Sequence, residues 1–153
     1  MRTVGLISDT HGLLRPSALR ALQGSDLIIH AGDIGTPEIL AELGEIAPVV
    51  AVRGNVDKGE WAKALPETAV AGAGSILIYV LHDVKQMDLD PTAAQFQVVV
   101  SGHSHQPGQM ERNGVLYVNP VSAGPRRFKL PIMVAKLDVR SAPIGVEFVP
   151  LAE

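Results

Sequence analysis

The first third of the chain alternates short apolar runs with helix-like stretches, and this alternation restricts the fold more than any other feature. Residues 4–8, 27–30 and 49–52 are rich in Val, Ile and Leu and lack a polar alternation, which is typical of strands buried on both faces. Two successive strand–helix–strand units predict a parallel sheet here, because such crossovers are right-handed and bring their strands into one sheet.

The two helix-like stretches carry signals for their first turns. The first covers residues 16–23 and starts with a proline, a residue favoured at the first helical position. The second starts at Thr36-Pro37-Glu38, which combines a hydroxyl, a proline and a carboxylate near the positive end of the helix dipole. We therefore expect the Thr36 hydroxyl to cap this helix.

The second half of the chain is richer in strands. Asn113-Gly114 predicts a hairpin turn between 110–112 and 115–118, and residues 90–95 carry a weak helical signal. A parallel half followed by a strand-rich half predicts two sheets packed face to face with helices outside, in a single domain over residues 1–153. The strand-like segments are 75–81, 96–101, 115–119, 132–138 and 144–149.

Composition limits the function classes. The chain has 153 residues, 46% hydrophobic and 19% charged, which fits one globular domain and excludes a disordered chain. It has no cysteine, so any metal must be held by imidazole and oxygen ligands. The net charge of −3 argues against a nucleic-acid groove. With no membrane span or targeting segment in view, we expect a cytoplasmic protein that acts on a small molecule, and a homo-oligomer stays open as an alternative to a monomer.

Polar side chains follow five of the predicted strands at the point where each strand ends. Ligands of open parallel sheets bind outside the carboxyl ends of the strands. Taken singly, Gly-Asp and Gly-Asn pairs are ordinary turns, and a lone histidine is usually a hydrogen-bonded surface residue. Their repetition at five strand ends favours one shared site. The residues concerned are Asp9, His11, Asp33, Asn55, His82, His103 and His105.

These motifs carry a family resemblance from residue 4 to about residue 127. The chain resembles the calcineurin-like metallophosphoesterase superfamily, and within it the small single-domain prokaryotic phosphodiesterases. The resemblance implies an α/β fold with four layers, in which helices flank two packed β-sheets. It is carried by Asp9-x-His11, Gly32-Asp33, Gly54-Asn55-x-Asp57, His82, Gly102-His103-x-His105, Asn119-Pro120-x-Ser122 and Pro125-Arg126.

The resemblance also implies a dinuclear metal site. Asp9, His11 and His105 would hold one ion, Asn55, His82 and His103 the other, and Asp33 would bridge them. Such ligands suit divalent transition ions, with Mn²⁺ as the first expectation and Ni²⁺, Fe²⁺, Zn²⁺ or Co²⁺ as alternatives. The implied reaction is phosphodiester hydrolysis by in-line attack of a metal-bridging hydroxide, with Asp9, Asp33 and Asn55 as the catalytic residues.

Three positions depart from the family pattern. Val56 stands where many members have a histidine that protonates the leaving group or contacts the phosphate, and valine can do neither, so we expect diesters and aryl leaving groups to react best. Asp83 stands where glycine is usual and could be a ligand, a proton carrier, a residue behind the ligands or a surface residue; we favour the last two. Val121 replaces another glycine, and valine disfavours a positive φ.

Two further residues and one rival function stay open at this stage. Arg126, like Asn55, could contact the phosphate of the substrate, although an arginine here is as readily a surface charge. His30 lies inside a predicted strand, where it either makes an ordinary hydrogen bond or orients Asp33. The rival function is that of a protein-interaction scaffold of the same fold. A eukaryotic retromer subunit has such a role and has lost metal ligands, whereas in this chain all seven ligand positions are filled.

Overall fold

The computed structural model describes residues 1–104, 108–126 and 130–152. A first sheet of five strands has the order β10-β9-β1-β2-β3. The strands β1, β2 and β3 are parallel, and β9 pairs antiparallel with both β1 and β10. Its strands are β1 (Thr3–Ile7), β2 (Leu27–His30), β3 (Val49–Ala51), β9 (Met133–Asp138) and β10 (Gly145–Pro150).

A second sheet of five strands has the order β4-β5-β6-β8-β7. The strands β5, β6 and β8 are parallel, and the hairpins β4–β5 and β7–β8 close the two edges. Its strands are β4 (Thr68–Ala73), β5 (Ile76–Leu81), β6 (Val98–Val100), β7 (Gly108–Arg112) and β8 (Val115–Asn119).

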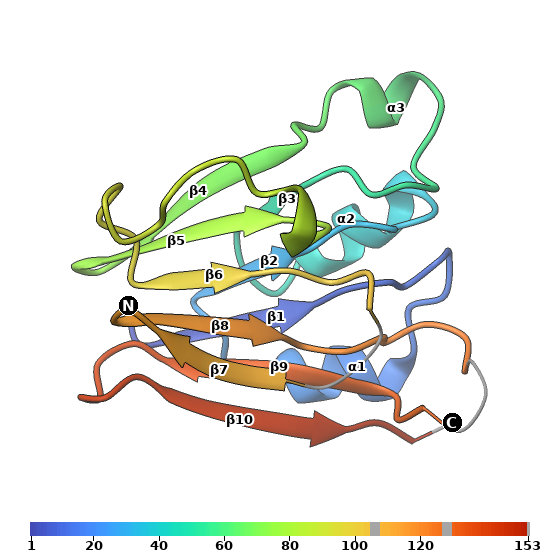
Figure 1. Ribbon diagram of the computed structural model, residues 1–153. Coiled ribbons are helices and arrows are strands. Elements are labelled where there is room, and N and C mark those ends of the chain that lie inside the picture. The colour runs from blue at the N-terminus through green and yellow to red at the C-terminus, as the bar shows by residue number, and fades with distance from the viewer. Residues whose placement is uncertain (105–107, 127–129, 153) are drawn as a thin grey trace.

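The two sheets pack face to face, and helices cover the outer face of the first (Figure 1). Side chains such as Leu6, Ile29, Ile78 and Val98 fill the space between the sheets. The helices α1 (Pro16–Leu22) and α2 (Pro37–Gly44) bury their apolar faces on the first sheet, which confirms the expected layers on this side.

The outer face of the second sheet is covered differently. Tyr79, Leu81, Val99 and Val115 form a small core there, and Met87, Leu89 and Phe96 pack on it. These last three residues belong to the loop between β5 and β6, whose one helical turn is the 3₁₀ helix η1 (Val84–Gln86). In the described part of the chain the fourth layer is therefore a loop with a short 3₁₀ turn rather than an α-helix.

Several local expectations are met, and others are wrong. Asn113 and Gly114 have φ values of 53° and 78°, as a two-residue hairpin turn requires. Thr36 does occupy the N-cap of α2, but its side chain makes no capping hydrogen bond. Residues 90–95 form turns rather than a helix, and Asp90 accepts a hydrogen bond from the Thr92 amide there.

Along the chain, helix α3 (Glu60–Lys63) and strand β4 follow β3 and precede β5. Of these, β4 was not expected, because Thr68–Ala73 is made mostly of Ala and Gly, which have low strand propensity. Among the described residues no helix has the length and apolar character that a membrane span requires.

The carboxyl ends of β1, β2, β5, β6 and β8 lie on the same side of the molecule (Figure 1). The loops that follow these strands, together with the loop after β3, carry the polar residues that the sequence marks. Both sheets therefore contribute to one site.

Candidate metal centre

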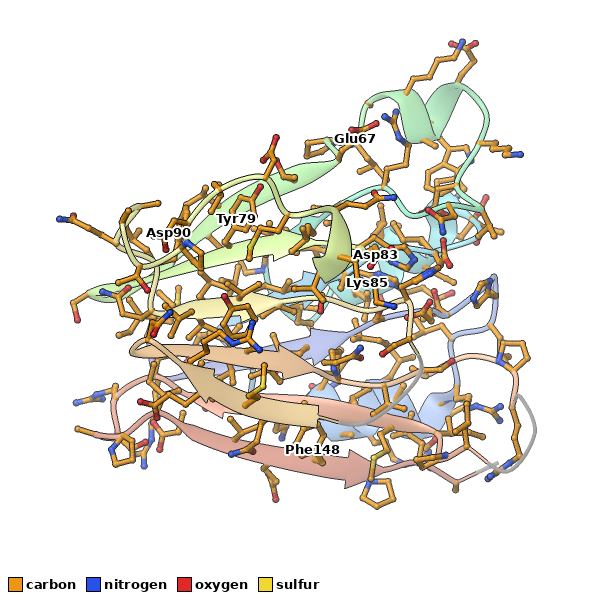
Figure 2. All side chains as sticks on the ribbon, in the orientation of Figure 1. Glu67, Tyr79, Asp83, Lys85, Asp90 and Phe148 are labelled. Carbon is orange, nitrogen blue, oxygen red and sulfur yellow. The ribbon has the colours of Figure 1, made fainter. Side chains whose placement is uncertain are left out.

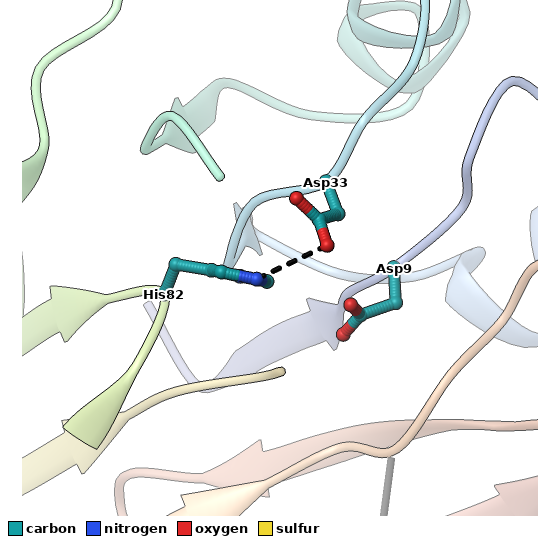
Figure 3. A group of neighbouring side chains, drawn as sticks. All are labelled: Asp9, Asp33 and His82. Atoms are coloured by element: carbon teal, nitrogen blue, oxygen red, sulfur yellow. Dashed lines mark ion pairs between the residues drawn. The ribbon is translucent and has the colours of Figure 1, made fainter. Parts of the chain in front are cut away.

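Three buried side chains meet at the centre of this edge. Asp9, Asp33 and His82 each offer a ligand atom, and these atoms lie within 4.8 Å of one another (Figure 3). Asp9 follows β1 and Asp33 follows β2, both in the first sheet, whereas His82 follows β5 in the second sheet. The cluster therefore depends on how the two sheets pack.

Asp33 faces both halves of the predicted site. Its Oδ2 lies 3.2 Å from His82 Nε2 and 3.7 Å from His11 Nε2. Its Oδ1 accepts a hydrogen bond of 3.0 Å from the Val56 amide, which fixes the orientation of the carboxylate. One oxygen of Asp33 thus lies close to two histidines that the family resemblance assigns to different ions.

The charges of Asp33 and His82 support each other. Burial opposes ionisation of Asp33, but the hydrogen bonds from His82 and from the Val56 amide outweigh it and lower its pKa below the ordinary value. Burial likewise opposes protonation of His82, but its contact with Asp33 prevails and raises its pKa above 6.5. Each side chain therefore favours the charged form of the other.

The ring of His82 is oriented for binding a cation. Nδ1–H donates a hydrogen bond of 2.8 Å to the Ala31 carbonyl. Nε2 is buried and lies 3.2 Å from Asp33 Oδ2, so in the neutral ring its lone pair faces the carboxylate cluster. A histidine whose one nitrogen is held by a carbonyl while the other faces the site is the usual arrangement of a metal ligand, and the donor set fits divalent transition ions.

Asp9 is fully buried and held from two sides. Its Oδ2 accepts a hydrogen bond of 2.6 Å from the Ser8 hydroxyl and one of 3.2 Å from the His103 amide. Its Oδ1 lies 3.8 Å from His11 Nε2. The loop after β6 is thereby tied to the loop after β1, and the carboxylate has little freedom to rotate.

Asn55 and His103 complete the second half of the predicted site. Asn55 Nδ2 lies 3.4 Å from His103 Nδ1, and the rings of His82 and His103 meet edge to face with centroids 5.2 Å apart. A hollow of about 230 Å³ opens beside this half, lined by Asn55, His82 and Asp83 among others. The three residues assigned to the second ion are therefore neighbours next to an open space.

Arg126 is the predicted residue, among those described, that is not brought into the cluster. His105 lies outside the described residues. Arg126 is exposed and donates a hydrogen bond of 3.1 Å from Nη1 to the Leu130 carbonyl. Its role in phosphate binding stays a prediction.

The backbone of the site has positive φ angles at residues other than glycine, a conformation that such residues rarely adopt. Asp9, His11, Asp33 and His103 all have φ between 48° and 71°, a region that costs non-glycine residues about 1–3 kcal/mol each. Val121 also has a positive φ, of 75°, so this turn keeps a glycine-like geometry in spite of the valine. Such conformations cluster at functional sites, and they aim these side chains at one point.

Sequence reasoning missed the role of one residue, Asp57. Its buried carboxylate accepts hydrogen bonds from the amides of Ile34, Gly35 and Gly54, at 2.9, 3.0 and 2.9 Å. Asp57 thus joins the loop that carries Asp33 to the loop that carries Asn55. The sequence did place Asp57 in the motif Gly54-Asn55-x-Asp57, but the motif does not show that the carboxylate joins these two loops.

His30 lies behind the site and makes hydrogen bonds through both ring nitrogens. The Gly32 amide donates to Nδ1 at 3.1 Å, and Nε2 lies 3.0 Å from the Thr10 hydroxyl, which donates in turn to the Ile34 carbonyl at 2.7 Å. The ring is therefore neutral with its proton on Nε2, and it links the loops after β1 and β2 without facing the carboxylate cluster.

Sequence comparison finds known proteins related to this chain. The sequence profile of the calcineurin-like phosphoesterase superfamily domain matches residues 1–142. A probable metallophosphoesterase of Methanothermobacter thermautotrophicus is 32% identical over 148 residues, which cover 88% of this chain and 86% of the relative.

Solved structures share the fold. An archaeal phosphodiesterase superposes with a TM-score of 0.81 at 21% identity, covering 97% of this chain and 99% of the other. Vps29 from Chaetomium thermophilum superposes with a TM-score of 0.79 at 19% identity, with full coverage of both chains. At these identities the likeness concerns the fold alone.

Proposed function

Because the chain belongs to the calcineurin-like phosphoesterase superfamily, we propose that it is a dinuclear metal-dependent phosphodiesterase acting on a small molecule. The observation that carries this proposal is that Asp33 Oδ2 lies 3.2 Å from His82 Nε2 and 3.7 Å from His11 Nε2. A carboxylate oxygen close to two imidazoles suits a bridge between two ions.

The proposed ligand set follows the family motif and these contacts. One ion would be held by Asp9, His11 and His105 and the other by Asn55, His82 and His103, with Asp33 shared by both. We propose Mn²⁺ as the native ion, since imidazole, carboxylate and amide oxygen together suit it.

The chain itself positions the ligands and the substrate. Two ions, when bound, supply Lewis acidity toward the phosphoryl oxygens and activate water for in-line attack at neutral pH. Asp9 and Asp33 hold the ligand geometry through the hydrogen bonds that fix their carboxylates. Asn55 lines the hollow beside His82, where its amide is placed to contact a substrate oxygen as well.

Val56 determines which leaving groups can be used. Its side chain is 48% exposed and carries no titratable proton, while its amide is engaged with Asp33. An alkoxide leaving group needs a proton, whereas an aryl oxide needs little help. We therefore expect aryl phosphodiesters to be hydrolysed faster than alkyl monoesters.

The test is a substrate screen of the purified protein reconstituted with Mn²⁺, Ni²⁺ or Zn²⁺. We expect a bis-aryl phosphodiester to be turned over faster than phenyl phosphate, and a chelator to abolish both activities. A faster rate on phenyl phosphate would refute the diester preference.

Replacement of the valine tests the reason for that preference. Val56→His places a proton donor beside the phosphoryl site and should accelerate monoesters with alkyl leaving groups, by up to about 100-fold relative to the aryl diester. The ratio of the two kcat/KM values measures this effect. An unchanged ratio would show that position 56 does not face the leaving group.

A scaffold function is the second candidate, and the similarity in fold to Vps29 is the observation that favours it. The described predicted ligands Asp9, His11, Asp33, Asn55, His82 and His103 are all side chains able to bind a metal, which favours the enzyme. Absence of turnover with every ion, together with absence of bound metal in elemental analysis, would favour the scaffold.

A further inference from the structure

The residue after His82 is an aspartate whose carboxylate is held in place by the backbone. Asp83 Oδ1 accepts a hydrogen bond of 3.0 Å from the Lys85 amide at the start of η1. Asp83 and Lys85 lie together beside the end of β5 (Figure 2). Because Oδ1 is engaged in this turn, the direction of Oδ2 is set as well.

Asp83 Oδ2 points at His103. It lies 3.9 Å from His103 Nε2, and the Asp83 side chain is only 18% exposed. This distance is longer than a hydrogen bond, and an approach of about 1 Å would make it one. The opposite nitrogen of the same ring, Nδ1, lies 3.4 Å from Asn55 Nδ2.

The two contacts select the same tautomer of His103. A carboxylate oxygen can only accept a hydrogen bond, so Asp83 favours a proton on Nε2. An amide nitrogen can only donate, so Asn55 favours a lone pair on Nδ1. Both neighbours therefore leave Nδ1 unprotonated, on the side of the ring that faces Asn55.

We propose that Asp83 is a positioning residue that holds His103 in the tautomer whose Nδ1 binds the second metal ion. The proposal rests on the proposed metal site. Asp83 lies behind the imidazole, at the nitrogen opposite the one that faces Asn55, and its other oxygen is used by the Lys85 amide, so it orients a ligand rather than being one.

His82 shows the same principle with the opposite tautomer. Its Nδ1–H is held by the Ala31 carbonyl, and its Nε2 faces the cluster. A glycine at position 83, as is usual in the family, would offer His103 no side-chain acceptor. A carboxylate that holds the non-ligating nitrogen raises the basicity of the ligand and fixes the ring.

The variant Asp83→Asn tests the contact with His103 while it keeps the hydrogen bond that Asp83 makes in its own turn. The asparagine Oδ1 can still accept from the Lys85 amide, but its NH₂ group cannot accept from His103 Nε2–H. We expect long-range ¹⁵N–¹H NMR of the metal-free protein to show His103 protonated on Nε2 in the wild type and shifted toward Nδ1–H in the variant. Titration with Mn²⁺ should show the affinity for the second ion, the one assigned to Asn55, His82 and His103, reduced roughly tenfold.

Asp90→Asn is the matched control. Asp90 is exposed on the same loop and lies away from Asp83 (Figure 2), and its replacement removes the same charge without touching His103 or the hollow that Asn55 lines. It should leave both the tautomer and the Mn²⁺ affinity unchanged. Thermal unfolding of both variants without metal checks that the fold is retained.

The outcomes separate this inference from the proposed function. A wild-type His103 protonated on Nδ1, an Asp83→Asn variant identical to the wild type, or an equal loss in Asp90→Asn would each overturn the role of Asp83. Failure of the wild type to bind any ion would overturn the proposed metal site instead, and the tautomer measurement would still decide whether Asp83 orients His103.

Discussion

Asp33 is the residue on which the candidate site depends most. Its carboxylate contacts His82, lies near His11 and is fixed by the Val56 amide. Asp33→Asn removes the negative charge that offsets the repulsion between two cations, and it places an NH₂ group where one oxygen stood. We expect elemental analysis to show loss of both ions and the diesterase assay to show no turnover.

The Asp90→Asn protein serves as the control for this loss, since it changes charge by the same amount and should keep both ions. The result that would sink the assignment is an Asp33→Asn protein that holds two ions and retains full turnover. A folded Asp33→Asn protein without metal, shown by its thermal unfolding, would place the effect at the site rather than in the fold.

At the scale of single residues the sequence predicted which side chains meet but not why they point inward. Asp9, Asp33 and His103 were expected from their places after strands. Their positive φ values arise from loop packing, which a sequence read residue by residue does not show. Gly102 illustrates this: an added Cβ would overlap the Ser8 hydroxyl and lie 2.7 Å from Asp9 Oδ2, so only glycine lets the loops approach so closely.

At the scale of elements, the loops after β2 and β3 are joined through Asp57. Its carboxylate accepts from three backbone amides of these loops. Depending on the orientation of its side chain, the asparagine in Asp57→Asn leaves either the Gly54 amide or both the Ile34 and Gly35 amides facing an NH₂ group. A buried amide without an acceptor costs about 2 kcal/mol, so we expect the free energy of unfolding to fall by about this amount, measured by urea denaturation.

Asp90→Asn is the comparison for this change. Asp90 is exposed and accepts only from nearby amides of its own turn, a role that asparagine can keep, and the variant should unfold like the wild type. Equal stabilities of Asp57→Asn and the wild type would show that Asp57 does not join the two loops energetically.

The elements predicted from sequence are those with strong local signals. The strands around β1, β2 and β5 are apolar and β-branched, and their bounds agree with expectation to within a residue or two. Strand β4 was missed because it owes its conformation to pairing with β5 along its whole length, a tertiary effect that overrides propensity. Residues 90–95 carried only a weak helical signal, and they form turns instead of a helix.

At the scale of the whole molecule, the site exists because two sheets present their carboxyl ends to the same side. The parallel arrangement in the first sheet followed from the crossover rule. The pairing of β6 with β8 and the placement of His82 beside Asp33 join segments that lie far apart in the chain. A local sequence pattern does not show how segments far apart in the chain pack together. The sequence could therefore indicate a shared site but not its geometry.

The buried His30 makes the stability of the fold depend on pH. Burial lowers its pKa from 6.5 to about 4, although the nearby carboxylates of Asp9 and Asp57 act in the opposite direction. Between these two pH values the unfolded chain holds a proton on His30 and the folded chain does not. The unfolded state therefore gains stability relative to the folded state as the pH falls through this window.

This difference predicts an acid-sensitive fold. In the metal-free protein His30 should contribute stability in full above pH 6.5 and lose about 3 kcal/mol of it as the pH falls to about 4. Urea denaturation at several pH values in the presence of a chelator measures this loss. In His30→Asn, which cannot take up the proton, the free energy of unfolding should fall less steeply over the same window, whatever its value at pH 7. Parallel curves for the two proteins would show that the buried imidazole is not what makes the fold sensitive to acid.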